Sequence, residues 1–474
     1  MYYRVDFKLC MLWILLVLQV LLVIYYLLMA PASYVFEYST PTPKEHEFSL
    51  SSNYKPYSVK FVAPSIAKAV SRRKEWQGYL TEADRVILPN IVLSSYFVKL
   101  NNESVCFVPG TDIGYTKKQH ADHMDHTKCE CKRGWHGKDC GQPEVIWRAF
   151  IASRQKISPR RRRKPRRIIH GFPITGLETT LAEIKLHELS HVVDCFVVGE
   201  SNHTATGHFK PFYFKQKLHK KGFISEDIRH KLLYIPLTNS LRSNNKGLNY
   251  SSTYSKSLRQ QLWQRGQATL TNLRSDDLYI DSTDAYEITN PKALLFFKLY
   301  DGWPLPVAFR LRWSAYGFFW QHPKRTIITP GAYTIGIMED LFRSNPSRIP
   351  GYLIPGVEEP GERSVYELVV GDLNHYGGWY CSWCLEPNDI LTMLQWAPHD
   401  NSPIDWDRMS GKKIDITYVE DLVGTGLWLD GVTALIRKSQ HGDLYFAPDY
   451  VANNTWKYDF LYTNFYSKLD YYNN

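Results

Sequence analysis

Three carboxylates follow a short apolar run in the stretch YIDSTDAYEITNP, Tyr279–Pro291: Asp281, Asp284 and Glu287. Carboxylates gathered in one turn can hold a divalent cation, which compensates the charge of a departing diphosphate without an all-protein cage. The alternative is an acidic turn that flanks a helix and binds no metal. Spacing alone does not decide between these two interpretations.

A strand and a helix are expected on either side of this turn. Leu278–Ile280 should form a short buried strand, and Asn290 with Pro291 should cap a helix that runs through KALLFFKLY to Asp301. Another helix is expected upstream, around Ser257–Leu273. The acidic turn therefore lies at a strand end, where a sheet presents ligands.

A β-α-β unit is predicted before these elements. Arg167–Phe172 (RIIHGF) is expected to form a strand, Leu177–Leu189 an amphipathic helix, and His191–Val198 (HVVDCFVV) a buried second strand. The unit ends in the polar loop GESNHTATG. Open parallel sheets bind ligands at the carboxyl ends of their strands.

The composition indicates a large folded protein. The chain has 474 residues, of which 44% are hydrophobic, enough for one large domain with smaller attachments. The net charge of +10 does not indicate a nucleic-acid partner, because about seven positive charges lie in one run, Ser158–Arg167. We interpret this run as a soluble hinge; a protease-sensitive linker and a lipid-headgroup contact are the alternatives.

The N-terminus contains an apolar stretch, Cys10–Met29, long enough to cross a membrane as a helix. Basic residues precede it, so we expect a cytosolic tail at 1–8, a signal-anchor at 9–30 and a luminal remainder. A cleaved signal peptide is the alternative, but the apolar run is long for one. The Pro- and Ser-rich segment 31–104 is expected to form a stem.

The text CECKRGWHGKDC, with the spacing Cys129-x-Cys131-x8-Cys140, resembles the C-terminal half of an EGF-like module. Glycines in such modules let small hairpins turn tightly under their disulfides. The resemblance implies a truncated module at 105–144, in which Cys106 pairs with Cys129 and Cys131 with Cys140. A basic linker, 145–166, should follow it.

Two further features fit a secretory lumen. Seven of the eight cysteines lie on the luminal side, and Asn-x-Ser/Thr sequons occur at Asn102, Asn202, Asn249 and Asn453. The loop QHADHMDHTK has three histidines and two aspartates that could ligate a transition metal, although we interpret it as a solvated polar loop. Cys381 and Cys384 form a CxxC for which a disulfide, a redox pair or other partners remain open, as does the state of Cys195.

Four blocks of the sequence resemble blocks of one known protein family. They are HELSHVVDCFVVGESNHTATG (His187–Gly207), FFKLYDGWPLPVAFRLRWSAYGFFW (Phe296–Trp320), HYGGWYCSWC (His375–Cys384) and TGLWLDG (Thr425–Gly431). With the half EGF-like module, these blocks resemble glycosyltransferase family 17, the family of the bisecting N-acetylglucosaminyltransferases. The resemblance implies an α/β, GT-A-like Rossmann-type luminal domain at 167–474.

The same resemblance implies an activity. The family's enzymes are type II Golgi membrane proteins that transfer GlcNAc from UDP-GlcNAc to O4 of the β-linked core mannose of N-glycans, with inversion. A divalent metal, Mn²⁺, would stabilise the departing UDP. Inversion suggests one in-line displacement with a carboxylate as general base, for which Asp430 and Glu287 are the candidates.

Further site residues are candidates because of their positions and side-chain chemistry. Donor-binding candidates are Glu200, Ser201 and Asp284, although the first two could instead belong to a solvated loop. Candidates for the acceptor site are His375, Trp379 and Trp383, since sugar faces stack on indoles, with buried core aromatics as the alternative. The core is expected to contain Trp313, Tyr316, Phe318 and Trp320.

The acidic turn departs from the family's pattern. The family has Asp-Asp-Ala-Asp-Glu where this chain has Thr283-Asp284-Ala285-Tyr286-Glu287, and a tyrosine is no carboxylate at neutral pH. Asp281 should point to the other side of the strand. Metal binding by Asp284 and Glu287 alone, and a catalytically silent luminal glycan-binding or scaffold protein, are both open. A weaker possibility is an adhesion or signalling protein that acts through its half EGF-like module.

Overall fold

The computed structural model describes ten stretches of the chain: residues 17–19, 60–61, 85–90, 96–100, 104–122, 128–153, 155–237, 250–349, 367–396 and 413–467. Chain contacts divide it into Met1–Pro56 and Tyr57–Asn474. Apart from residues 17–19, the predicted signal-anchor lies outside the described residues, as does most of the stem. Among the residues that are described, no helix is both long and apolar enough to cross a membrane.

Four parallel strands form one half of the main sheet: β7 (Ile168–Ile174), β8 (Cys195–Ser201), β9 (Leu232–Leu237) and β10 (Leu278–Asp281). Their order is β9-β8-β7-β10, and the two-residue β1 (Lys60–Phe61) pairs with β9. The chain runs outward from β7 to β9 and then returns to place β10 on the other side of β7. The strand order therefore reverses between β7 and β10.

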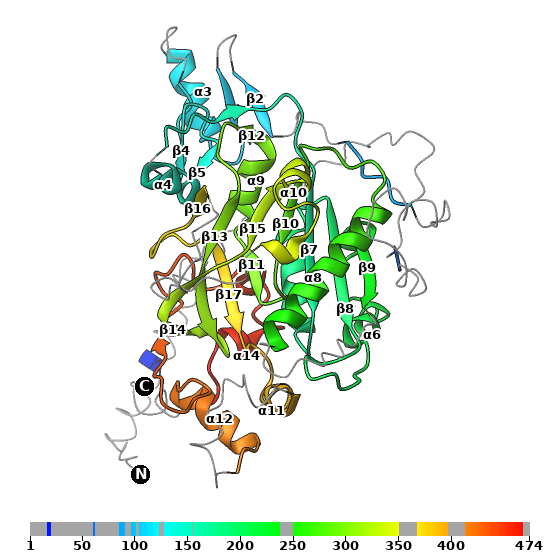
Figure 1. The fold of residues 1–474 in the computed structure, drawn as a ribbon. Coiled ribbons are helices and arrows are strands. Elements are labelled where there is room, and N and C mark those ends of the chain that lie inside the picture. The colour runs from blue at the N-terminus through cyan, green and yellow to red at the C-terminus, as the bar shows by residue number, and fades with distance from the viewer. Residues whose placement is uncertain are drawn as a thin grey trace, which may run out of the picture. The chain divides into compact units, whose positions relative to one another are not determined.

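Helices cover both faces of this half of the sheet. Helix α8 (Tyr250–Thr269) lies across β7, β8 and β9 (Figure 1). Helix α5 (Thr179–Leu189) connects β7 to β8 and is almost wholly buried, which confirms the predicted β-α-β unit. The second strand begins at Cys195 rather than His191, because the Asp194 carboxylate accepts a hydrogen bond from the backbone N–H of Ile168 (2.7 Å) and holds the chain in a turn there.

Antiparallel pairing extends the sheet beyond β10. The further strands are β15 (Gly331–Thr334), β13 (Val307–Ala315), β14 (Gly317–Ile328) and β18 (Ile436–Arg437), with β16 (Leu368–Val370), β17 (Gly378–Ser382) and β11 (Glu287–Thr289) joined at β13 and β17. The aromatic residues predicted to be core on β13 and β14 are buried. The chain is thus a mixed α/β protein.

Helix α9 (Pro291–Leu299) begins as predicted. The Asn290 side chain accepts hydrogen bonds from the backbone N–H groups of Lys292 and Ala293, and Pro291 occupies the first turn. The helix ends at Leu299 rather than Asp301, because Tyr300–Asp301 forms the short strand β12 and pairs with β6 (Arg160–Arg161).

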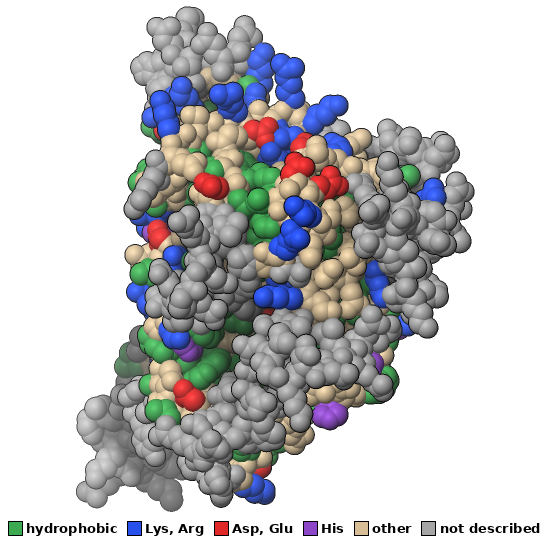
Figure 2. Space-filling view, in the orientation of Figure 1, with side chains coloured by type: hydrophobic (Ala, Val, Ile, Leu, Met, Phe, Trp, Pro, Cys, Tyr) green, Lys and Arg blue, Asp and Glu red, His purple; other side chains and the backbone are tan. Residues whose placement is uncertain are grey.

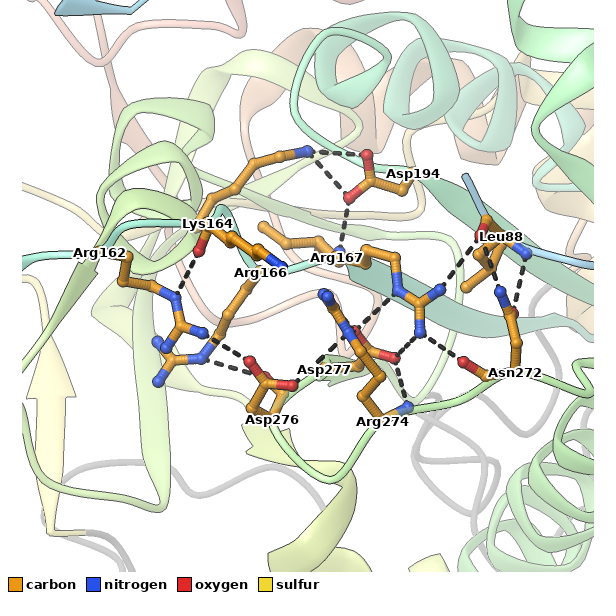
Figure 3. Close-up of polar contacts among 12 residues, drawn as sticks. Leu88, Arg162, Lys164, Arg166, Arg167, Asp194, Asn272, Arg274, Asp276 and Asp277 are labelled. Atoms are coloured by element: carbon orange, nitrogen blue, oxygen red, sulfur yellow. Dashed lines mark hydrogen bonds and ion pairs between the residues drawn. The ribbon is translucent and has the colours of Figure 1, made fainter. Parts of the chain in front are cut away.

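The end of the basic run is fixed to the folded domain, which contradicts the predicted hinge: Arg166 and Arg167 are buried, whereas Arg160, Arg161, Arg163 and Lys164 are exposed. Arg167 is buried and donates to both carboxylate oxygens of Asp277, while Arg162 pairs with Asp276 (2.5 Å) (Figure 3). Arg162 also pairs with Asp301 (2.6 Å). Arg166 also pairs with Asp301. Near the top of the view in Figure 2, Lys and Arg side chains lie among Asp and Glu side chains. Charge pairing across the fold therefore replaces a flexible linker.

The cysteine-rich segment packs against this domain. Its disulfides are Cys106–Cys129 and Cys131–Cys140, the pairs expected from the sequence. Its elements are β2 (Phe97–Lys99), β3 (Val105–Phe107), α3 (Ile113–Asp122), β4 (Trp135–His136), β5 (Gln142–Pro143) and α4 (Glu144–Ala152). The Tyr300 hydroxyl donates to Asp139 (2.8 Å), and helix α4 occupies the start of the expected basic linker.

Short helices complete the described part of the chain. They are α6 (Tyr213–Leu218), α7 (Glu226–His230), α10 (Ile335–Asp340), α11 (Pro387–Trp396), α12 (Ile416–Thr425), α13 (Asp449–Asn453) and α14 (Asp459–Tyr462), with a 3-10 turn at Pro346–Arg348. The predicted helix at Ser257–Leu273 is α8, which starts seven residues earlier.

Candidate active site

The carboxyl ends of β7 and β10 lie side by side, at the point where the strand order reverses. Asp281 pairs with Gly171 in the parallel register, and the Ser282 N–H donates to the Gly171 carbonyl (3.1 Å). The loop after β7 is closed by Glu178, whose carboxylate accepts from the backbone N–H of Thr175 (2.6 Å) and of the next residue (2.8 Å). Open α/β sheets bind ligands at such a crevice.

Asp281 does not take part in a three-carboxylate site. Its carboxylate pairs with the Arg259 guanidinium of α8, through Nε (3.2 Å) and Nη2, and both side chains are buried. Burial raises the pKa of Asp281, and Arg259 opposes that shift. Asp281 thus already has a fixed cation partner in Arg259, and its role as a metal ligand stays a prediction.

Asp284 and Glu287 occupy the turn itself. Glu287, the first residue of β11, is buried, and its Oε1 accepts from the N–H (2.7 Å) and the hydroxyl of Thr283. Asp284 is partly exposed, and its Oδ1 accepts from the Tyr286 N–H (2.8 Å). Of the two, Asp284 is the carboxylate that a ligand can reach.

A buried lysine lies under the turn. Lys185 of α5 donates through Nζ to the backbone carbonyl of Asp284 (2.9 Å) and lies 4.2 Å from the ring centre of Phe172. Burial lowers the pKa of Lys185 to about 8, even though the carboxylates of Glu287 and Asp284 act to raise it. Both carboxylates therefore share one nearby protein cation.

Tyr286 replaces a carboxylate of the family pattern and remains a neutral phenol. Burial raises its pKa well above 10, and the charges of Glu178 and Asp284 add to the shift. Tyr286 also accepts, through its backbone carbonyl, a hydrogen bond from the Cys381 N–H (3.1 Å). The turn is thus fixed to the neighbouring strand β17.

The described residues suit a metal ion that is bound partly by the protein and partly by a ligand, rather than by protein side chains alone. Nowhere in the stretches that the structure describes do three His, Cys, Asp or Glu side chains gather to hold a metal ion. The first four residues of the histidine-rich segment belong to helix α3, and residues 123–127 lie outside those stretches. Asp284, backed by Glu287, can supply one or two carboxylate oxygens to a cation whose other ligands are phosphate oxygens, which suits Mg²⁺ and Mn²⁺.

Glu200 and Ser201 lie at the end of β8 and are fully buried, so the solvated-loop alternative is wrong. The Glu200 carboxylate accepts from the N–H groups of Phe214 (2.7 Å) and Lys215 (3.0 Å) and from the Tyr234 hydroxyl (2.7 Å). Burial raises the pKa of Glu200 despite these bonds. Its observed contacts fix the start of α6; a contact with uridine stays a prediction.

Asp430 forms a turn between Trp428 and the following strand. Its Oδ1 accepts from the N–H groups of Val432 (2.9 Å) and Thr433 (2.8 Å), and its Oδ2 accepts from the Thr433 hydroxyl. Burial alone would raise the pKa of Asp430, but these hydrogen bonds outweigh it and lower the pKa. Asp430 is therefore ionised and partly exposed.

Aromatic rings connect the Asp430 turn to the acidic turn. Trp428 meets Trp313 edge to face at 6.1 Å, Trp313 meets Tyr380 at 6.2 Å, and Tyr380 meets Tyr286 at 6.2 Å between ring centres. Trp428, Tyr380 and Tyr286 are all partly exposed. Partly exposed aromatic rings next to carboxylates are suited to stacking on sugar faces.

The predicted acceptor residues are not brought together. Trp379 is 4% exposed and donates from Nε1 to the Tyr445 carbonyl (2.9 Å), which makes it a core residue. His375 precedes β17 and lies near Asp372 (3.3 Å), whereas Trp383 follows the strand at its other end. Trp383 is partly buried against the aromatic core.

The remaining cysteines and sequons are placed as follows. Cys381 and Cys384 form a disulfide, and Cys195 is a free, buried thiol. Asn453 is exposed at the end of α13, and Asn202 is partly buried beside His203. The sequons at Asn102 and Asn249 lie outside the described residues, so glycosylation stays a prediction.

Three charged residues of the site were missed in the sequence: Lys185, Lys210 and Arg259. Lys185 sits among apolar residues of a helix, where nothing in the sequence distinguishes it from a surface lysine. Lys210 follows the polar loop that the sequence did single out, only three residues beyond Gly207. Extending that loop to the next helix start would have included it.

A family model and three related proteins all place this chain near the same kind of enzyme. Residues 156–327 match the model of glycosyltransferase family 17. A human β-1,4-mannosyl-glycoprotein 4-β-N-acetylglucosaminyltransferase is 34% identical over 412 residues, covering 79% of this chain and 75% of the human protein. Rat and mouse proteins of that name are 35% and 34% identical over 345 residues, which is 72% of this chain and 62% of each relative. No solved structure gave a significant match.

Proposed function

This chain belongs to glycosyltransferase family 17, and we propose that it transfers GlcNAc from UDP-GlcNAc to O4 of the β-linked core mannose of N-glycans. The observation that supports this most strongly is the 34% identity that extends over three quarters of the human enzyme. The geometry agrees with it, because the acidic turn lies at the switch point between β7 and β10. We assign the domain to the GT-A type on that arrangement.

The donor site is proposed to lie on the acidic turn. Asp284, with Glu287 behind it, would hold a Mn²⁺ ion together with the diphosphate of the donor. That cation, when bound, compensates the charge that develops on UDP as it leaves. Lys185 fixes the turn by donating to the Asp284 carbonyl (2.9 Å), so the carboxylate is held in place before the donor arrives.

Asp430 is the better candidate for the general base. Glu287 is 1% exposed and its Oε1 is held by Thr283, whereas Asp430 is ionised and partly exposed. In the proposed step, Asp430 takes the proton of the acceptor hydroxyl as its oxygen bonds to the anomeric carbon. The bond from that carbon to the β-phosphate oxygen breaks, and UDP takes the electron pair. The partly exposed rings of Trp428 and Tyr380 would support the acceptor sugar.

The cellular setting is part of the same proposal. We propose a single-pass type II Golgi membrane protein, anchored by residues 9–30, with the folded domain in the lumen. Three disulfides within the described residues fit an oxidising compartment. The segment 105–144 is proposed to be the half EGF-like module.

The test uses the purified full-length chain in detergent. Binding of UDP is measured by calorimetry with and without Mn²⁺, and transfer of GlcNAc to an N-glycan acceptor is measured by mass spectrometry. We expect both for the wild type, and a loss of at least about 100-fold in transfer for Asp284→Ala. Asp340→Ala, an exposed carboxylate on α10, is the matched control and should change neither. A folded wild type that binds no UDP would reject the transferase and favour a glycan-binding or scaffold protein.

A further inference from the structure

Lys210 lies at the end of a closed loop beside the carboxyl end of β8. The loop is fixed by hydrogen bonds from the Thr204 N–H to the His208 carbonyl and from the Lys210 N–H to the Asn202 carbonyl, each 2.8 Å long. Gly207 adopts a left-handed φ of 86°, which lets the loop turn back toward the strand. The backbone of Lys210 is therefore held at the edge of the sheet where ligands bind.

The ammonium group of Lys210 is buried and makes no hydrogen bond within the described residues. The side chain is 1% exposed, and its Nζ has no acceptor there. The two other buried lysines differ, because Lys185 donates to the Asp284 carbonyl and Lys298 donates to the Val192 carbonyl and to Asp194. A buried ammonium without acceptors is costly, and such groups usually have a functional reason.

The charges around Lys210 connect it to the acidic turn. Burial lowers the pKa of Lys210, while the carboxylates of Glu200 and Glu178 lie near enough to act against that shift. The charge of Glu178 also helps to raise the pKa of Tyr286 in the turn. The two carboxylates accept hydrogen bonds from other groups: Glu178 from the Thr175 N–H and Glu200 from the Phe214 N–H. They keep Lys210 charged without binding its Nζ.

We propose that Lys210 binds the diphosphate of the sugar-nucleotide donor, with Nζ donating hydrogen bonds to phosphate oxygens. This inference rests on the proposed function and adds a residue to its donor site. A phosphate supplies the acceptors that the Lys210 ammonium lacks. A fixed cation at this position would also offset the loss of two carboxylates from the acidic turn, at Thr283 and Tyr286, because less of the diphosphate charge is left for the metal ion to balance.

The experiment compares UDP with uridine, which has no phosphate, on the full-length chain in the presence of Mn²⁺. Lys210→Met should weaken UDP binding by about 10- to 100-fold, the usual range for a hydrogen bond to a charged group, and should leave uridine binding unchanged. Lys210→Arg should retain most of the UDP affinity. Lys215→Met, which removes an exposed lysine on α6, is the matched control and should bind UDP as the wild type does.

The outcomes separate the two proposals. If Lys210→Met binds UDP as tightly as the wild type, the inference is wrong while the transferase proposal stands. Equal weakening of UDP and uridine would also overturn it, since Lys210 would then shape the pocket as a whole. A wild type that binds neither ligand would reject the proposed function and this inference together. Retained uridine binding in Lys210→Met shows that the variant is folded.

Discussion

Buried charges are compensated differently at the amino ends and at the carboxyl ends of the parallel strands. At the amino end, Arg167 directly precedes β7 and Asp277 directly precedes β10, and the two side chains form a buried ion pair. Arg162 and Arg166 add pairs to Asp276 and Asp301. Each of these arginines therefore has a carboxylate partner, and Figure 3 shows those of Arg162 and Arg167.

At the carboxyl ends of the parallel strands, Asp281 keeps a buried partner in Arg259, but two buried lysines have weaker compensation. Lys185 donates to a backbone carbonyl rather than to a carboxylate, and Lys210 has no acceptor among the described residues. Removing one partner of a buried ion pair destabilises the fold, whereas a buried charge without such a partner can bind a ligand. The comparison predicts that mutations of the paired residues, Asp281 included, change stability and that mutations of the two lysines change binding.

The largest effect is expected from Arg167→Met. Removing Arg167 leaves the buried Asp277 carboxylate with only the partly exposed Arg274 as a cation partner (3.1 Å), and breaking a buried pair typically costs about 3 to 5 kcal/mol of unfolding free energy. Urea unfolding followed by fluorescence measures the loss. UDP affinity of the molecules that remain folded should not change.

Arg163→Met is the control for that substitution. Arg163 belongs to the same basic run but is exposed, so its loss should change the unfolding free energy by less than about 0.5 kcal/mol. Equal effects of the two substitutions would mean that the basic run is a hinge after all.

Local signals made part of the fold predictable from the sequence. The β-α-β unit follows from apolar periodicity within Ile168–Ser201, and the start of α9 follows from the Asn290-Pro291 pair, because a cap is formed by neighbours in the chain. The family and the position of the acidic turn at a strand end were also predictable. Both depend on short stretches of sequence.

Long-range pairing made the rest unpredictable. Arg167 and Asp277 are 110 residues apart, so the sequence shows only a basic run and an acidic pair that seem unrelated. The sequence likewise does not show that Asp281 pairs with Arg259, from a helix 22 residues earlier. The sequence alone does not show whether a charged residue is buried in the fold or which residue it pairs with.

Asp281→Asn tests whether Asp281 belongs with the paired charges. The amide keeps the shape of the side chain but leaves the Arg259 cation uncompensated, so we expect a loss of about 3 kcal/mol in unfolding free energy. The Mn²⁺ dependence of UDP binding should stay as in the wild type. If it disappears while the protein stays folded, Asp281 is a metal ligand and the turn rearranges on binding.

Glu188 is a buried carboxylate that is stabilised by a backbone hydrogen bond rather than by an ion pair, so it extends the comparison. Its carboxylate accepts from the Tyr450 N–H (2.7 Å), and burial raises its pKa to about 7. A raised carboxyl pKa favours the folded state in acid, and that stability is lost as the pH rises from about 4.5 through 7. Between pH 5 and pH 7, the wild type should lose about 2 kcal/mol more than Glu188→Gln. Parallel pH profiles of unfolding for the two proteins would contradict this.

The smallest effect on folding is expected from Asp430→Asn. Asparagine keeps the oxygen that accepts from the Val432 and Thr433 N–H groups, so only the bond from the Thr433 hydroxyl changes and the cost should be under about 1 kcal/mol. An amide cannot accept the acceptor's proton, so transfer should slow by about 100-fold or more while UDP affinity is retained. Thr433→Val removes the same hydroxyl bond without removing the carboxylate, and it should leave transfer near the wild-type rate. Equal rates for wild type and Asp430→Asn would assign the turn a structural role and place the base elsewhere.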